Sequence, residues 1–218
     1  MKKGFPDQDG QGVVLSMIKT IQENFGLLSE IDGAIGDGDH GVNMNKGFTI
    51  CGQRLESEPG SFAKGLQTLG RVLLAEIGGA MGPLYGSFFL DMSRAARDHD
   101  VIDIEVFQQM LERGTSSVSS LGNARVGDKT MIDALVPALE AYKKAAAAGS
   151  DFARALEEMA AGAERGKEST RNLAAKIGRA SRLGERSVGK LDAGATSCAL
   201  LLGAMARSIT SLLSEGGA

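Results

Sequence analysis

Apolar residues recur at intervals of three and four in eight segments of the chain, and this helical period limits the possible folds more than any other feature. The first segment, from Gly10 to Phe25, places Val14, Ile18 and Ile21 on one face and is expected to end at Gly26. The chain contains neither a convincing strand alternation nor a repeat of solenoid length. The sequence therefore predicts an all-α fold.

The other seven predicted helices follow from the same spacing. They span about 42–55, 62–77, 84–98, 103–118, 128–139, 151–177 and 195–213. Ser61 is predicted to cap the third helix and Asp128 the sixth. Because consecutive helices joined by short loops pack antiparallel, we predict an eight-helix up-and-down bundle that forms a single domain over residues 1–218.

Four unusual loops fall on the odd-numbered connections, which share one end of such a bundle. They are Asp32–Gly41, Gly78–Pro83, Gly122–Asp128 and Gly178–Gly194. Together they would bring carboxylates, a glycine-rich turn and several Arg and Lys side chains to one rim, as a metal-bridged polyphosphate requires. The chain lacks the GxxxxGK[ST] phosphate loop, so this would be an unrelated nucleotide site.

The loop DGAIGDGDHG carries the strongest chemical signal. Asp32, Asp37 and Asp39 place three carboxylates within eight residues, and glycines between them let the backbone turn tightly. Carboxylates brought together repel one another unless a cation lies between them. Ligands that are all oxygen favour Mg²⁺ or Ca²⁺ over zinc.

Two other interpretations of this loop must be compared with the metal site. Asp and Gly are common in turns, and Asp39 could simply cap the helix that begins near Val42. An EF-hand would need a Glu at the twelfth loop position, where counting from Asp32 or Asp37 gives Asn43 or Phe48. The EF-hand pattern therefore fails, whereas the turn remains an alternative to the metal site.

Composition excludes several classes of protein. The net charge is −3 and the basic residues are interleaved with acidic ones, which argues against nucleic-acid binding. We expect a cytoplasmic protein, because no run reaches the length of a membrane span and MKKGFPDQDG has no apolar leader. Cys51 and Cys198 lie in apolar helical patterns, so we expect reduced core cysteines.

Four ordered motifs closely resemble the L subunit, or nucleotide-binding domain, of the dihydroxyacetone kinase family. They are AIGDGDHGVNM at 34–44, GGAMGPLYGSFF at 78–89, GDKTMIDAL at 127–135 and GRASRLGERSVGKLDAGATS at 178–197. The resemblance covers nearly the whole chain. It implies an eight-helix antiparallel barrel with the nucleotide at one rim.

The resemblance also implies the site. Asp32, Asp37 and Asp39 would bind two Mg²⁺ ions that bridge the phosphates of ADP or ATP, with no covalent nucleophile on the chain. The residues along the nucleotide would be His40, Gly41, Val42, Asn43, Ala80, Met81, Gly122, Thr130, Met131, Arg179, Asp192, Ala193 and Gly194. For His40, a bond to a loop carbonyl is the alternative role. The chain departs from the family at Met81, where Ser is common, and at Ala193, where Pro is common.

The family's chemistry implies a phosphotransferase that works with partners. Phosphate would pass from a phosphocarrier M subunit of the phosphotransferase system, through bound ADP/ATP, to dihydroxyacetone held on a separate K subunit. The alternatives are an ATP-dependent kinase subunit for dihydroxyacetone or another small ketose, and a nucleotide-sensing partner of a transcription regulator. Possible docking contacts on the rim are Arg94, Arg97, Arg182 and Lys190.

Overall fold

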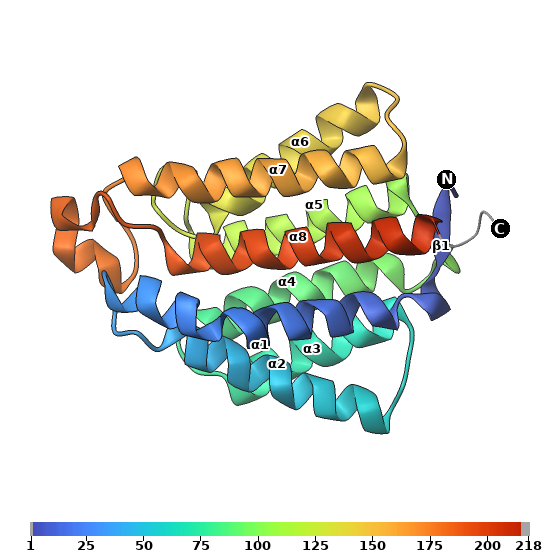
Figure 1. Cartoon of the computed structure of the whole chain (residues 1–218), viewed down its shortest axis with the longest axis horizontal. Coiled ribbons are helices and arrows are strands. Elements are labelled where there is room, and N and C mark those ends of the chain that lie inside the picture. Colours follow the sequence, from blue (N-terminus) through green and yellow to red (C-terminus); the bar gives the residue numbers. More distant parts are fainter. Residues whose placement is uncertain (1, 215–218) are drawn as a thin grey trace.

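The computed structural model describes residues 2–214, and this part of the chain contains eight long α-helices (Figure 1). They are α1 (Gln11–Gly33), α2 (His40–Ser57), α3 (Phe62–Glu76), α4 (Met81–Ala96), α5 (Ile104–Gly122), α6 (Ile132–Ala147), α7 (Phe152–Ser169) and α8 (Ala193–Ser214). Each helix packs against the next, and α8 returns to α1. The helices therefore close into an antiparallel barrel, which confirms the predicted all-α class.

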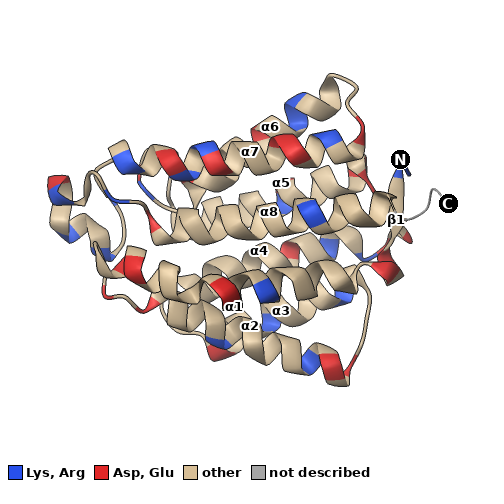
Figure 2. Ribbon diagram, viewed as in Figure 1, with Lys and Arg blue, Asp and Glu red and all other residues tan. Residues whose placement is uncertain are grey.

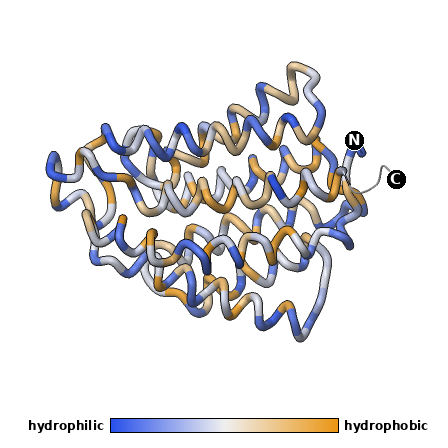
Figure 3. Tube along the Cα trace, viewed as in Figure 1, coloured by the Kyte–Doolittle hydropathy of each residue, from blue (hydrophilic) through white to orange (hydrophobic). Residues whose placement is uncertain are grey.

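The inside of the barrel is filled by the apolar faces that the sequence predicts. Met17, Ile21, Phe48, Phe89 and Met205 are completely buried in it. Along the helices, hydrophobic and hydrophilic residues alternate with each turn (Figure 3). The helices of the barrel therefore pack together through their buried apolar faces.

Side-chain caps fix the beginnings of several helices. Ser61 Oγ accepts a hydrogen bond from the Lys64 amide at 3.2 Å, which confirms the predicted cap of α3. The prediction that Asp128 caps the sixth helix is wrong, because α6 begins only at Ile132. The carboxylate of Asp133 accepts from the amides of Gly127 and Thr130 and closes a turn before the helix.

The first helix is longer than predicted. It continues through Gly26 to Gly33 because Leu28, one further turn along, is completely buried in the core. Gly26 itself is solvent-exposed within the helix. Burial of Leu28 offsets the helix-breaking tendency of one exposed glycine, which costs about 1 kcal/mol.

We expect Gly26→Ala to raise the free energy of unfolding by about 0.5–1 kcal/mol, because Ala loses less backbone entropy in a helix. A Cβ atom added at Gly26 meets none of the described atoms within 4 Å, so no clash opposes this gain. Urea denaturation followed by circular dichroism measures the effect. A lower midpoint for the variant would contradict the exposed and unstrained helical position of Gly26.

The seventh helix is shorter than predicted. α7 ends at Ser169 rather than near Ile177, and a 3-10 turn (Thr170–Asn172) follows. The carbonyl of Thr170 accepts a hydrogen bond from Lys129 Nζ at 2.6 Å, a contact from far along the chain. A second 3-10 segment, Arg179–Ser187, lies in the long connection to α8.

A small antiparallel sheet, which the sequence did not predict, lies at the end of the barrel opposite the long α7–α8 connection (Figure 1). Strand β1 (Gly4–Pro6) pairs with β2 (Val101–Asp103), and Phe5 and Ile102 are buried partners. The carboxyl end of α4 lies at this same end, so the placement of Arg94 and Arg97 on the rim is wrong. The two side chains contact Asp91 and Asp98 instead.

Helix α8 is long and apolar enough to meet a length-and-composition test for a membrane span, with a mean hydropathy of 1.4. Of its apolar window, however, 67% is buried inside the barrel. Few charges mark this helix in Figure 2. Its apolar character is therefore explained by its central position between α7 and α1.

Candidate functional site

A cavity of about 500 Å³ opens at one end of the barrel. Its walls come from the α1–α2, α3–α4, α5–α6 and α7–α8 connections and the helix ends beside them. The four loops that the sequence assigns to one end thus do meet there. The antiparallel order of the helices makes them neighbours although they are far apart in the chain.

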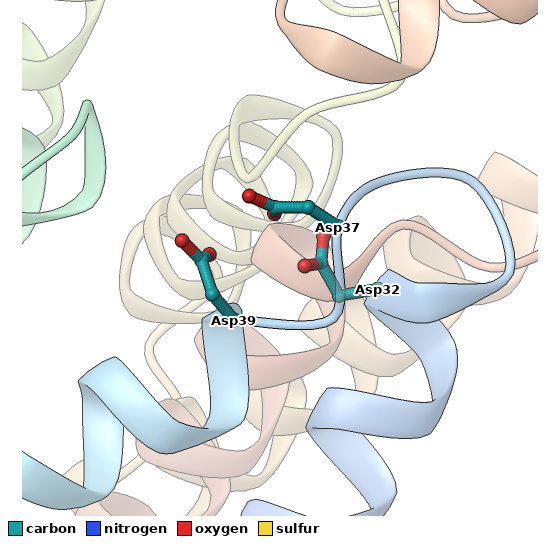
Figure 4. A group of neighbouring side chains, drawn as sticks. All are labelled: Asp32, Asp37 and Asp39. Atoms are coloured by element: carbon teal, nitrogen blue, oxygen red, sulfur yellow. The ribbon is translucent and has the colours of Figure 1, made fainter.

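Three carboxylates gather on one side of the α1–α2 loop (Figure 4). Asp32, Asp37 and Asp39 each offer an oxygen, and these oxygens lie within 4.8 Å of one another. Oxygens bound to one Mg²⁺ at about 2.1 Å are at most about 4.2 Å apart, so small side-chain rotations would complete such a site. The group therefore fits a hard divalent cation.

The alternative interpretation, in which Asp39 only caps a helix, is wrong. Its side chain makes no capping hydrogen bond at the start of α2. The amide of His40 donates instead to Asp32 Oδ2 at 3.3 Å. The carboxylate of Asp39 is exposed and available to a ligand.

Arg179 joins the α7–α8 connection to the carboxylate group. Its guanidinium contacts Asp37 Oδ2 and lies 3.3 Å from Asp39 Oδ2. This positive charge offsets the mutual repulsion of the carboxylates. The site therefore combines oxygen ligands for a cation with a guanidinium suited to phosphate oxygens.

The ring of His40 is fixed by a hydrogen-bonded chain beneath the carboxylates. His40 Nε2 lies 2.9 Å from Ser197 Oγ, and Ser197 Oγ lies 2.7 Å from the hydroxyl of the buried Tyr85. Burial lowers the pKa of His40 to about 4, although the charge of Asp32 opposes this effect. The imidazole is therefore neutral at neutral pH and is held by a hydroxyl rather than by a loop carbonyl.

The glycine-rich turn leads directly into α4. Gly78, Gly79, Ala80 and Met81 line the cavity, and α4 begins at Met81. The first amides of a helix have no carbonyl partner within it and carry partial positive charge. This end of α4 is therefore suited to bind an anion in the cavity.

The sequence did not single out Lys129, which is only 2% exposed. Its amino group donates to the carbonyls of Thr170 (2.6 Å), Ser187 (3.0 Å) and Lys190 (2.5 Å). Burial lowers the pKa of Lys129, whereas the carboxylates of Asp192 and Asp133 raise it. The position of Lys129 within the GDKTMIDAL motif was the available signal.

Asp192 lies at the start of α8. Its Oδ2 accepts a hydrogen bond from the Ala195 amide at 2.7 Å. Burial raises the pKa of Asp192 to about 7, while that hydrogen bond and the charge of Lys129 lower it. Asp192 is thus both a helix cap and part of the cavity wall.

Nearly all the residues predicted to lie along a nucleotide do line the cavity. They are His40, Asn43, Ala80, Met81, Gly122, Thr130, Met131, Arg179, Asp192, Ala193 and Gly194. Gly41 and Val42 are outside this lining. Gly41 packs tightly against α1, and Val42 is 57% exposed.

Part of the cavity wall is apolar. Leu84, Val118, Met131 and Ile132 line it, and the sequence reasoning identified only Met131 among them. The others follow the same helical period as core residues, so their spacing alone did not distinguish them. An apolar wall beside a polar rim is typical of a small-molecule site.

Comparisons with known proteins agree with this geometry. The DAK2 domain family matches residues 34–207. The ADP-binding subunit DhaL of PEP-dependent dihydroxyacetone kinase 1 from Listeria innocua is 41% identical over 186 residues, covering 85% of this chain and 88% of the relative. The corresponding DhaL subunit from Escherichia coli is 38% identical over 179 residues, covering 80% and 84% of the two chains.

Other relatives contain a similar region within a longer chain. D-erythrulose kinase of Mycolicibacterium smegmatis is 34% identical over 84% of this chain, which spans 32% of that enzyme. The crystal structure of C. freundii dihydroxyacetone kinase in complex with AMP-PNP and Mg²⁺ superposes with a TM-score of 0.69 and 24% identity. The superposition covers 91% of this chain and 33% of the C. freundii chain. The folds thus agree, and by its sequence the chain belongs to the DAK2 domain family, among the relatives of the DhaL subunits of dihydroxyacetone kinases.

Proposed function

We propose that the chain is a phosphotransferase subunit that binds Mg²⁺ with ADP or ATP and takes part in the phosphorylation of dihydroxyacetone. The observation that carries this proposal is the group formed by Asp32, Asp37 and Asp39 at the mouth of the cavity, beside the first turn of α4. The names of the DhaL relatives, as ADP-binding subunits of PEP-dependent dihydroxyacetone kinases, support it.

In this proposal the three carboxylates hold two Mg²⁺ ions, which neutralise phosphate charge when bound. The free amides at Ala80 and Met81, together with Arg179, bind phosphate oxygens. Met81 contributes its backbone, because its side chain cannot donate a hydrogen bond. The apolar wall formed by Leu84, Val118 and Ile132 suits the face of a nucleobase.

Phosphoryl transfer depends mainly on positioning and charge neutralisation, so the chain needs no covalent nucleophile. The neutral His40 is held by Ser197 and maintains the start of α2 rather than carrying phosphate. The remaining lining residues, from Gly122 to Gly194 in the chain, complete the nucleotide site. The proposal includes all thirteen nucleotide positions inferred from the family resemblance. Of these, Gly41 and Val42 act through the backbone of α2.

The proposal includes partners that supply and receive the phosphate. A phosphocarrier M subunit charges the bound ADP, and a K subunit holds dihydroxyacetone at the mouth of the cavity. Arg182 and Lys190 in the α7–α8 connection are exposed, as are Val42, Leu121 and Val126 at or near helix ends on the same end of the barrel. Together they offer a mixed basic and apolar docking face. Residues 1–218 act as one domain in the cytoplasm.

A second candidate is a kinase subunit that uses exchangeable ATP for another small ketose. The similarity to D-erythrulose kinase favours it, although this chain spans only 32% of that enzyme. A nucleotide-sensing role with a transcription regulator is a third possibility in the same family. The retention of nucleotide during purification separates the first two.

We expect protein purified gently in Mg²⁺ and then denatured to release nearly one ADP per chain, identified by chromatography. Retained ADP supports a captive coenzyme that is recharged by a phosphocarrier. An empty protein that binds and readily releases Mg-ATP would instead indicate the exchangeable-ATP kinase. Failure to bind either nucleotide in the presence of Mg²⁺ would contradict the proposed function.

A further inference from the structure

The connection between α7 and α8 forms a strap at one end of the barrel (Figure 1), and residues 177–180 of this strap line the cavity. We define the strap as residues 170–192, with two arms, 170–176 and 187–192, and a tip, 177–186. The arms are joined by hydrogen bonds from the Gly189 amide to the Arg171 carbonyl (2.7 Å) and from the Ala175 amide to Ser187 Oγ (2.8 Å). The strap is thus an ordered unit that leaves the barrel and returns to it.

Lys129 inserts between the two arms from the α5–α6 connection. Its amino group binds the Thr170 carbonyl in the first arm and the carbonyls of Ser187 and Lys190 in the second. An ammonium group has three N–H donors, so these three acceptors use its full capacity. One buried side chain therefore fastens both arms to the barrel.

The environment of Lys129 indicates a dedicated structural position. The residue is 2% exposed and has a positive φ of 62°, an uncommon conformation for a residue other than glycine. The carboxylates of Asp192 and Asp133 partly compensate its buried charge. Removing the amino group would leave three carbonyls without this donor, and an unpaired buried acceptor is costly.

The tip of the strap forms one wall of the cavity. Ile177, Gly178, Arg179 and Ala180 line it, and Arg179 reaches across to Asp37 and Asp39. Lys129 also lines the cavity, but its amino group is engaged by the strap. The position of the tip over the cavity therefore depends on how firmly Lys129 holds the arms.

We propose that Lys129 is a positioning residue that holds the strap over the cavity and thereby slows the release of bound nucleotide. This inference rests on the proposed function for the identity of the ligand. It assigns the retention of nucleotide to a contact that lies outside the carboxylate group.

The test compares Lys129→Met, which keeps the length of the side chain but removes its donors, with the wild-type protein. Dissociation of a fluorescent ADP analogue in Mg²⁺, chased with excess ADP, should become at least on the order of tenfold faster, because the variant loses three hydrogen bonds to a charged group and one such bond alone is worth about this factor. In nucleotide-free protein, amide hydrogen exchange should accelerate within residues 171–190 and stay unchanged in α3.

Phe107→Leu provides a matched control for a general loss of stability. Phe107 is completely buried at the far end of the barrel, where it packs against Tyr142 and Phe152 at ring distances of 5.6 Å. We expect this variant to be less stable but to release nucleotide at the wild-type rate. Equal acceleration in Phe107→Leu would overturn the inference, and so would an unchanged release rate in Lys129→Met.

If Lys129→Met fails to fold, Ser187→Ala tests the same unit. It removes the hydroxyl that accepts from the Ala175 amide and donates to the Gly184 carbonyl. Faster nucleotide release and faster strap exchange support the inference, and wild-type values for both contradict it. If the wild-type protein binds no ADP analogue, the proposed function is contradicted. Amide hydrogen exchange in the strap would still show whether Lys129 fastens the strap to the barrel.

Discussion

Asp37→Asn is expected to weaken binding of Mg-ADP by at least about 100-fold. Loss of a residue that merely orients a metal ligand commonly costs 10–100-fold, so loss of a ligand should reach or exceed the upper value. Without metal, the melting temperature should change by less than about 2 °C, because removing one of three adjacent carboxylates also removes repulsion. Titration calorimetry with Mg-ADP and thermal unfolding with and without Mg²⁺ measure the two effects.

Asp98→Asn is the matched control for this prediction. Its side chain is 84% exposed and lies beyond the end of α4, on the side of the barrel away from the cavity. It should keep wild-type affinity, as well as wild-type turnover with a K subunit, whereas Asp37→Asn should lose both. Full affinity and turnover in Asp37→Asn would show that the three carboxylates are not a metal site.

Gly41→Ala is expected to lower the free energy of unfolding by about 3 kcal/mol, the upper range for overpacking a tight contact. A Cβ atom at Gly41 would lie 2.0 Å from the Phe25 carbonyl oxygen and 2.7 Å from the Ser29 amide nitrogen. These are backbone atoms of α1, so the clash moves α2 away. Asp39 and His40 would move with it, and binding of Mg-ADP should weaken as well.

Urea denaturation gives the stability change, provided that the slope with denaturant is unchanged. Gly26→Ala is the comparison, because it adds the same methyl group to a neighbouring helix without a steric clash. The two substitutions should therefore change stability in opposite directions. A Gly41→Ala protein as stable as the wild type would contradict the close approach of Gly41 to the backbone of α1.

The sequence predicted the helices well where local periodicity controls the outcome. Met44, Phe48 and Cys51, assigned to the inner face of the second helix, are all completely buried. The common end of the four special loops also followed from sequence order, because short connections reverse the chain direction. The same order places the carboxyl end of α4 at the end of the barrel away from the cavity. The prediction that Arg94 and Arg97 lie on the rim did not take this into account.

The features that the sequence did not reveal depend on contacts between distant residues. The end of α7 depends on Lys129, which binds the Thr170 carbonyl from 41 residues earlier in the chain. The pairing of β1 with β2 joins strands of three residues each, too short for a period to be recognised. The carboxylates were identifiable because several stand close together in one loop, whereas Lys129 is a single basic residue whose acceptors lie 41 or more residues away in the sequence.

The closure of the barrel brings both ends of the described chain to the side away from the cavity, where the Lys2 amide lies 3.3 Å from the Leu213 carbonyl oxygen. Helix α8 has 22 residues and is therefore about 33 Å long. A second domain tethered after α8 needs about ten extended residues to reach the cavity mouth along the barrel. A separate subunit, in contrast, can approach the open mouth directly, without a tether that spans the barrel.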